Sequence, residues 1–174
     1  MPEFIQQRHK PLVELERPRE LIVACAPLRS NINLSRIVRT AGCLGIRKLI
    51  ATGPARIVDK IARNSTDDGD DTEASGVELV SHRTLPPVLQ KLRAEGYQLV
   101  GLEQTTDSQS IFEFPFERKT ALIVGNERSG LDEESLRLVH RVVEIPMFGL
   151  PYALNVATAT AMTLYEYCRQ FPRG

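Results

Sequence analysis

Short apolar runs that are typical of buried strands alternate with amphipathic stretches along the chain. The runs are bounded by Gly, Pro or polar residues and carry few charges. They predict strands at 21–26, 48–51, 77–81, 97–102, 119–124 and 141–145. Such alternation of strand and helix favours an α/β fold, a Rossmann-like parallel sheet with helices on both faces.

The intervening stretches have helical periodicity and recognisable ends. Ser30 or Asn31 can cap a helix that Gly45 ends, and Thr84 can cap a second helix that runs to Ala94. We expect further helices at 57–63, after Asp132 and over about 154–169. The last of these carries a stripe of mostly small residues, which allows close approach by the sheet or by a second subunit; the stripe comprises Ala157, Ala161, Leu164 and Tyr165.

A chain of 174 residues fits one domain, so we expect residues 1–174 to form a single unit. The amino terminus lacks a secretory apolar segment, and no apolar run reaches the roughly 18 residues of a membrane helix. These features predict a soluble, cytoplasmic protein without a membrane partner. The acidic run at 64–72 lacks EF-hand spacing, which favours a solvated loop over a calcium site.

Cysteine and histidine offer no evidence of a metal site. The three cysteines are widely separated and include no C-x-x-C pair, and the three histidines share no ligand-like spacing. Buried apolar roles suit the cysteines better. We therefore expect no metal.

Charge is balanced overall but unevenly distributed. Residues 1–63 carry 12 Lys/Arg and 5 Asp/Glu, a net +7, whereas residues 64–174 carry 10 and 17, a net −7. The amino-terminal part is therefore a candidate surface for RNA. A solvated surface without a partner is an equally valid interpretation of the charge alone.

The most informative polar segments follow two of the predicted strands. Residues 125–130 (GNERSG) follow one strand, and residues 146–156 (PMFGLPYALNV) follow the next. In open α/β sheets, ligands bind at the carboxyl ends of the strands, so these loops are candidates for a binding site. The chain contains neither G-x-G-x-x-G nor G-x-x-x-x-G-K-[ST], which argues against a dinucleotide enzyme and a P-loop NTPase.

A third candidate segment, residues 31–45, lies in the first helix. Asn33 and Arg39 are six residues apart, nearly two helical turns, and both can point near the same end of the sheet. Considered alone, Asn33 is better explained as a helix cap and Arg39 as a surface ion-pair residue than as functional residues.

Together, these three segments resemble the three signature motifs of the SpoU/TrmH family of RNA ribose 2′-O-methyltransferases. The resemblance implies a deep trefoil knot in the carboxyl-terminal part, S-adenosylmethionine as cofactor, and a homodimer formed through the last helix. It implies catalytic roles for Asn33, Arg39, Glu127 and Asn155. It implies cofactor contacts from Leu102, Gly125, Ile145, Met147, Ala153 and Leu154.

The implied reaction moves a methyl group to a ribose 2′-hydroxyl, so positioning should dominate catalysis. A hydroxyl is a poor nucleophile at neutral pH, yet a guanidinium is effectively never deprotonated. We therefore expect Arg39 to grip the neighbouring phosphate and to lower the effective pKa of the hydroxyl. The chain departs from the family where Ser-Leu-Asn-Val-Ser is usual, because Ala153 and Ala157 replace both serines.

The resemblance leaves the RNA open. Because no separate RNA-binding domain is apparent, tRNA is favoured over rRNA, with a D-loop guanosine as a candidate target. A non-catalytic RNA-binding or assembly protein on the same scaffold is the main alternative, suggested by Ala153 and the neutral charge. A small-molecule nucleotide enzyme has only the fold class in its favour.

Overall fold

The computed structural model describes residues 11–54, 76–150 and 152–174. Its centre is one parallel sheet with the strand order β3-β2-β1-β6-β4-β7-β5. Every strand pairs in parallel with its neighbours. The strands are β1 (Leu21–Cys25), β2 (Lys48–Thr52), β3 (Glu78–His82), β4 (Gln98–Leu102), β5 (Gln109–Ser110), β6 (Thr120–Val124) and β7 (Arg141–Glu144).

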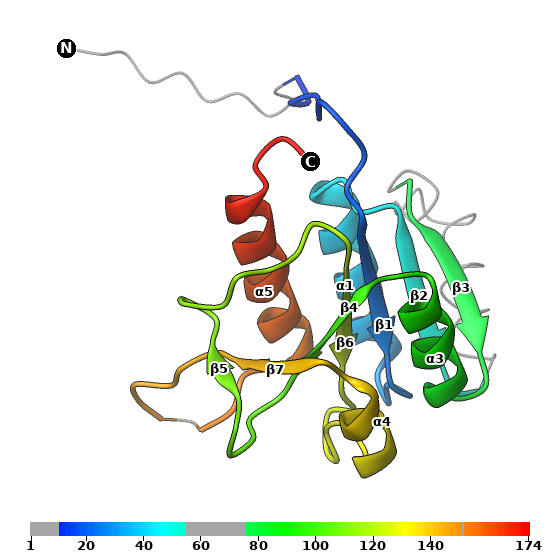
Figure 1. Ribbon diagram of the computed structural model, residues 1–174, viewed down its shortest axis with the longest axis vertical. Coiled ribbons are helices and arrows are strands. Elements are labelled where there is room, and N and C mark those ends of the chain that lie inside the picture. The colour runs from blue at the N-terminus through cyan, green and yellow to red at the C-terminus, as the bar shows by residue number, and fades with distance from the viewer. Residues whose placement is uncertain (1–10, 55–75, 151) are drawn as a thin grey trace.

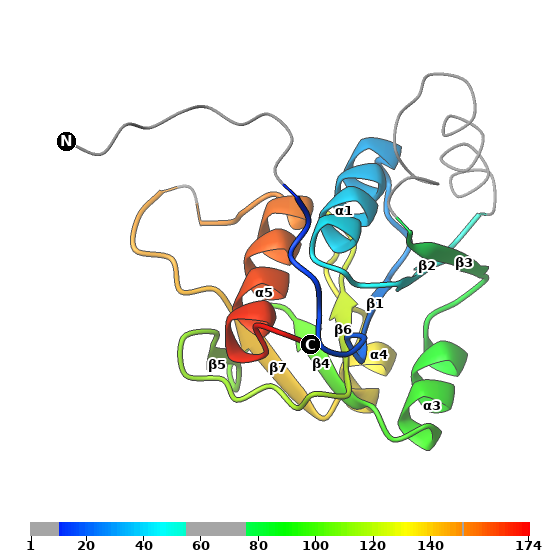
Figure 2. The same ribbon diagram turned by 90° about the horizontal axis from the view of Figure 1, so that it is seen from above.

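Helices cover both faces of this sheet, as Figures 1 and 2 show. Within β1, Val23 and Cys25 face one layer, and Ile22 and Ala24 face the other. The first layer contains α1 (Asn31–Cys43) and α5 (Val156–Gln170), and the second contains α3 (Pro86–Ala94) and α4 (Glu133–Leu138). Because both faces of the central strands are buried, their sequences are continuous apolar runs.

Most expected elements are confirmed within one or two residues. Ser30 caps α1 by accepting a hydrogen bond from the Asn33 backbone N–H at 3.3 Å. Gly45 ends that helix with a φ of 73°, a conformation that favours glycine. The expected helix at 57–63 and the acidic loop at 64–72 lie outside the described residues.

Two expected helix starts differ from the structure, and one strand was not predicted. Thr84 does not cap α3, since the cap position is Leu85, which makes no side-chain capping bond. Proline suits the first turn that follows, because its φ is preset and its missing N–H would be unpaired there. The last helix begins at Val156 because Asn155 is its cap, and the two-residue strand β5 has no apolar run to predict it.

The small-residue stripe predicted on the last helix divides between two environments. Ala157 and Leu164 are buried in the layer that α5 shares with α1. Ala161 and Tyr165 instead line a groove on the outer side of that layer. Close approach to the sheet therefore explains only half of the stripe.

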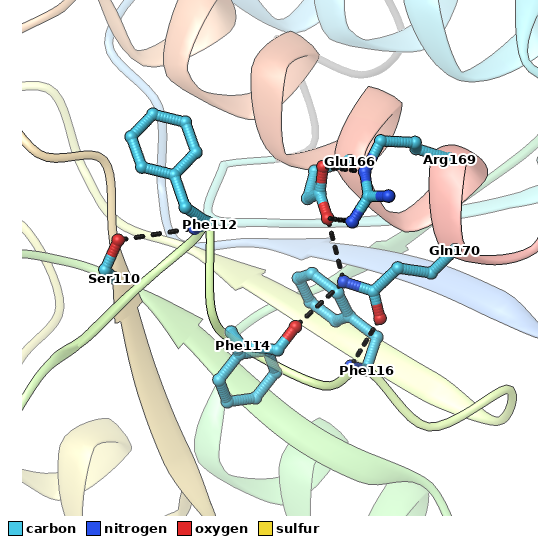
Figure 3. Close-up of polar contacts among 7 residues, drawn as sticks. All are labelled: Ser110, Phe112, Phe114, Phe116, Glu166, Arg169 and Gln170. Carbon is cyan, nitrogen blue, oxygen red and sulfur yellow. Dashed lines mark hydrogen bonds and ion pairs between the residues drawn. The ribbon is translucent and has the colours of Figure 1, made fainter.

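The carboxyl-terminal part of α5 is held by the segment that connects β5 to β6. Gln170 Nε2 donates hydrogen bonds to the Phe114 carbonyl at 2.8 Å and to Glu166 at 2.9 Å, and Gln170 Oε1 accepts one from the Phe116 N–H at 3.0 Å, as Figure 3 shows. Figure 1 shows this segment crossing α5. These hydrogen bonds join the end of α5 to a segment that lies more than 50 residues earlier in the sequence.

Tyr167 fastens the same crossing from inside the core. Its side chain is 1% exposed, and its hydroxyl donates a hydrogen bond to the Arg118 carbonyl at 2.6 Å. Burial raises the pKa of Tyr167 to about 12, partly offset by the nearby guanidinium groups of Arg19 and Arg118. The hydroxyl therefore keeps its proton and remains a donor at neutral pH.

Replacing Tyr167 with Phe should lower the free energy of unfolding by about 1 to 3 kcal/mol, because the partly buried carbonyl of Arg118 loses its partner. Urea denaturation measures the change. Tyr165→Phe is the matched control, since Tyr165 is 69% exposed on the same helix, and it should change stability little. Equal stability of both variants and the wild-type protein would contradict this account of the crossing.

Candidate functional site

The carboxyl ends of four adjacent strands open onto one edge of the sheet. β1, β6, β4 and β7 are neighbours in parallel, so the segments that follow Cys25, Val124, Leu102 and Glu144 emerge side by side. A cavity of about 440 Å³ lies at this edge. Its volume falls within the roughly 300 to 1,000 Å³ that is typical of small-molecule sites.

Nine of the ten residues predicted for the site line this cavity. They are Asn33, Leu102, Gly125, Glu127, Ile145, Met147, Ala153, Leu154 and Asn155. The tenth, Arg39, lines a separate groove between α1 and α5. The structure thus brings the three sequence motifs together, but it separates Arg39 from Asn33.

Glu127 is the centre of the polar contacts that join these motifs. Its carboxylate accepts hydrogen bonds from the backbone N–H groups of Arg29 at 2.8 Å and Ser30 at 3.1 Å. It also accepts one from Asn33 Nδ2 at 3.0 Å. The loop after β6 is therefore fastened to the turn that starts α1.

These contacts keep Glu127 ionised. Partial burial alone raises the pKa of Glu127, but the hydrogen bonds from Arg29, Asn33 and Ser30 outweigh burial and leave its pKa below the ordinary value. A carboxylate that accepts several N–H bonds behaves in this way. Its lone pairs are engaged with the protein, so the geometry suits a positioning role.

Asn33 and Asn155 extend the contacts to α5. Asn155 Nδ2 donates a hydrogen bond to Asn33 Oδ1 at 3.2 Å. Asn155 Oδ1 accepts from the N–H groups of Ala157 at 2.9 Å and Thr158 at 3.4 Å, which caps α5. Asn155 therefore both caps α5 and orients the side-chain amide of Asn33.

The loop after β6 folds tightly because two of its residues are glycine. A Cβ on Gly125 would lie 2.6 Å from the carbonyl carbon of Gly130, and Gly130 has a φ of 65°. A Cβ on Gly130 would lie 2.1 Å from Glu103 Oε2. That oxygen accepts a hydrogen bond from the Leu131 N–H at 3.0 Å, so Glu103 fixes the end of the loop.

Two further carboxylates line the cavity, Glu103 and Glu144, and neither was predicted from the sequence. Glu144 Oε2 accepts a hydrogen bond from Ser108 Oγ at 2.8 Å. The position of Glu103 directly after a predicted strand was a signal that could have found it, whereas Glu144 stood inside an expected strand. Among the described residues, no group of three or more His, Cys, Asp or Glu side chains is arranged to hold a metal ion.

Residues 20–165 match the sequence profile of the SpoU rRNA Methylase family. The tRNA (guanosine(18)-2′-O)-methyltransferase of Escherichia coli K12 is 29% identical over 154 residues, which are 88% of this chain and 65% of that protein. The chain therefore spans slightly less than two thirds of that relative. The Thermus thermophilus protein of the same name is 30% identical over 172 residues, which are 98% of this chain and 86% of that protein.

A relative with a different substrate in its name is also similar. The 23S rRNA (uridine(2479)-2′-O)-methyltransferase of Streptomyces viridochromogenes is 35% identical over 142 residues, which are 79% of this chain and 48% of that protein.

Solved structures share the fold. The A. aeolicus TrmH/SpoU tRNA modifying enzyme superposes with a TM-score of 0.75 at 26% identity, covering 91% of this chain and 78% of that one. The SpoU methyltransferase AviRb from S. viridochromogenes, in complex with the cofactor AdoMet, superposes with a TM-score of 0.74 at 31% identity. The match covers 91% of this chain and 63% of that one.

Replacing Glu127 with Gln should lower the free energy of unfolding by roughly 1 to 3 kcal/mol at neutral pH, since charge-assisted hydrogen bonds become weaker or are lost. Because the pKa of Glu127 is lowered in the folded state, the stability that its carboxylate contributes depends on pH. Its stabilisation is complete above the unfolded value of about 4.5 and disappears as the pH falls through the lower folded value. Denaturant titrations between pH 3 and 7 measure both effects.

The control is Glu113→Gln, which removes an exposed carboxylate from the segment between β5 and β6. Its unfolding curve should follow that of the wild-type protein across this pH range. If Glu127→Gln and Glu113→Gln behave alike, the carboxylate does not hold the loops together.

Proposed function

Because the chain belongs to the SpoU rRNA methylase family, we propose that it transfers a methyl group from S-adenosylmethionine to a ribose 2′-hydroxyl of RNA. The observation that carries the proposal is the meeting of Asn33, Glu127 and Asn155, one from each sequence motif, at a single cavity. A ligand held there lies against all three motifs at once.

The residues of the cavity fit this cofactor. Apolar side chains such as Ile145, Met147 and Leu154 suit an adenine ring, and the glycine at 125 lets the backbone pack closely. Glu103 and Glu144 place carboxylates beside a molecule that carries a sulfonium and an ammonium group. S-adenosylmethionine would supply the electrophilic methyl group on its sulfur.

The protein's own part in the reaction is positioning. The bond from Asn155 to Asn33 and the bond from Asn33 to Glu127 hold both amides in one orientation, so they can direct a ribose hydroxyl. We propose that Arg39, which lines the separate groove between α1 and α5, grips the phosphate next to that ribose where the RNA extends beyond the first cavity, and stabilises the negative charge that develops on the hydroxyl oxygen.

We infer that the RNA is tRNA and that a D-loop guanosine is the target. Relatives named for tRNA guanosine methylation cover up to 98% of this chain, which supports tRNA. The similarity to a 23S rRNA enzyme supports rRNA as the second candidate. Either RNA would place the activity in the cytoplasm. Among the described residues, no helix is long and apolar enough to span a membrane.

The test is methyl transfer from labelled S-adenosylmethionine to separate tRNA and rRNA transcripts, followed by mass spectrometry of the digested nucleosides. A 2′-O-methylguanosine from tRNA is the expected product. A methylated rRNA nucleotide would support the second candidate. RNA binding without transfer to either RNA would contradict the enzymatic proposal and favour a non-catalytic assembly role.

The proposal includes a homodimer that forms through α5. The groove between α1 and α5 has a volume of about 650 Å³ and is lined by apolar side chains that are largely exposed in the single chain. They include Phe112, which points away from the Gln170 cluster in Figure 3, together with Met162 and Tyr165. Covering such a surface with a second copy removes apolar area from water, and Arg39 then lies beside the interface.

The proposal also includes the deep trefoil knot that the family resemblance implies. The crossing of 111–119 over α5 supports it, together with the bonds from Tyr167 and Gln170 that hold this crossing closed. The last helix follows β7 and packs beside α1 in the same layer, so the chain returns across earlier segments.

Arg39→Ala should reduce methyl transfer at saturating RNA by about 100-fold or more, because transition-state charge loses its guanidinium. Binding of S-adenosylmethionine should stay within about twofold, because Arg39 does not line the first cavity. Calorimetry and a radiolabel-transfer assay measure the two quantities. Arg36→Ala, an exposed arginine one turn earlier on α1, is the control, and normal turnover by Arg39→Ala would refute the catalytic role.

Ala153→Ser tests the departure from the family's usual serine. Ala153 lines the cavity and is exposed, so a new hydroxyl can find a polar group of the cofactor or water. Binding of S-adenosylmethionine should tighten by about 0.5 to 1.5 kcal/mol, the worth of one neutral hydrogen bond. Calorimetric titration of both proteins gives the sign, and weaker binding would mean that the loop is packed around alanine.

The dimer predicts a mass by light scattering of twice 19.5 kDa. Tyr165→Glu should give a monomer, because it puts a charge into the apolar groove. Thr158→Glu, on the same helix but outside the groove, should leave the dimer intact. A wild-type monomer at micromolar concentration that still methylates RNA would disprove the dimer.

A further inference from the structure

The loop between β7 and α5 exposes large apolar side chains. Phe148 is 90% exposed, Leu150 75% and Tyr152 79%. Two aromatic rings within five residues therefore stand in water on one loop. Apolar groups gathered in this way mark a surface that binds something, since burial of each ring would stabilise the bound state.

The position of these rings relative to the first cavity suggests what they bind. Met147 and Ala153, which are next in sequence to the two aromatic residues, line the cavity. Figure 2 shows the same connection, in orange, standing off the body of the molecule formed by the sheet and its helices. The rings thus belong to a segment whose two ends border the proposed methyl-transfer site and whose middle extends outward.

Positive charge borders the same cavity. Arg128 is exposed and lines it, and Arg29 is an exposed residue whose backbone N–H is bonded to Glu127. Guanidinium groups and exposed aromatic rings at the border of one cavity are a combination that suits single-stranded nucleic acid, because the first can bind phosphate and the second can stack on bases.

We propose that Phe148 and Tyr152 stack on the bases of unpaired RNA nucleotides and so hold the target ribose at the mouth of the first cavity. This inference rests on the proposed function and adds the two side chains that hold the target nucleotide. A base in a continuous duplex is already stacked on its neighbours and cannot lie against a protein ring. The target nucleotide is therefore in a single-stranded loop or is turned out of its stack.

A second copy of the chain is a less suitable occupant of this surface. The groove proposed for dimerisation is lined by residues of α1, α5 and 111–112, and it shares no lining residue with the first cavity. The aromatic loop borders the cavity that contains Asn33 and Glu127, where RNA must come.

The experiment compares Phe148→Ala and Tyr152→Ala with the matched variants Phe148→Tyr and Tyr152→Phe, which keep a ring. Fluorescence anisotropy with a labelled tRNA transcript gives the Kd for RNA. Each alanine variant should bind RNA about 5- to 150-fold more weakly, the loss expected when one stacked base is released. The ring-preserving variants should stay within about threefold of the wild-type protein.

RNA with abasic nucleotides locates the contact. Removing the base at the methylated position or beside it should weaken binding to the wild-type protein, but it should have little further effect on the alanine variant whose ring had stacked there. Equal losses for all proteins would overturn the stacking contact. The Kd for S-adenosylmethionine and the mass in solution should not change in any variant.

Two other outcomes would overturn the inference. Weaker S-adenosylmethionine binding with unchanged RNA binding would make the loop a cover for the cofactor, and a change in mass would make it a subunit contact. If the wild-type protein methylates RNA and the alanine variants bind RNA normally, the inference fails and the proposed function stands. If the wild-type protein transfers no methyl group but its RNA binding depends on the rings, the proposed function fails while the stacking surface stands.

Discussion

The carboxylate of Glu127 holds together parts of the chain that meet only in the folded state. It accepts N–H bonds from the turn after β1 and from Asn33, and Asn33 in turn accepts one from Asn155 at the start of α5. Because Asn33 donates through Nδ2 and accepts through Oδ1, its amide has one favourable orientation. The shape of the cavity therefore depends on a chain of contacts in which each member fixes the next.

This arrangement requires a parallel sheet with the order seen here. The exits of β1, β6 and β4 adjoin one another, so the carboxylates of Glu127 and Glu103 can reach the loops beside them without long connections. Glu103 occupies the space that a Cβ on Gly130 would need, and Gly125 packs against Gly130 in the same way. The glycines allow the loop to close, and the carboxylates then hold it closed.

The sequence predicted the central fold well because the physics of those elements is local. An apolar run such as 120–124 has few alternatives to a buried strand, and Ser30 before an amphipathic stretch is a sufficient cap. The cap at Thr84 was wrongly predicted and β5 was not predicted, because neither feature is decided by the local sequence alone. Proline at the start of α3 made a side-chain cap unnecessary, and a two-residue strand depends on its neighbour β7 rather than on its own sequence.

The site was predictable where motifs lay directly after strands, and less so where helical geometry mattered. Asn33 and Arg39 are separated by six residues, which places them about 9 Å apart along α1 and about 120° apart around it. That angle turns Arg39 away from the cavity of Asn33 and toward the groove beside α5. The spacing of Asn33 and Arg39 in the sequence predicted that both point near the same end of the sheet. Their different directions around the helix axis place them in different cavities.

The two alanines that replace the family's serines also have different consequences. Ala157 is buried, and its N–H already has a partner in Asn155 Oδ1, so the cap of α5 does not require a hydroxyl there. A serine at 157 would have to satisfy its oxygen within an apolar layer. Ala153 is exposed at the cavity, where a hydroxyl affects only what binds. Alanine at 157 therefore affects the packing of α5 against the core, whereas alanine at 153 affects recognition of the ligand.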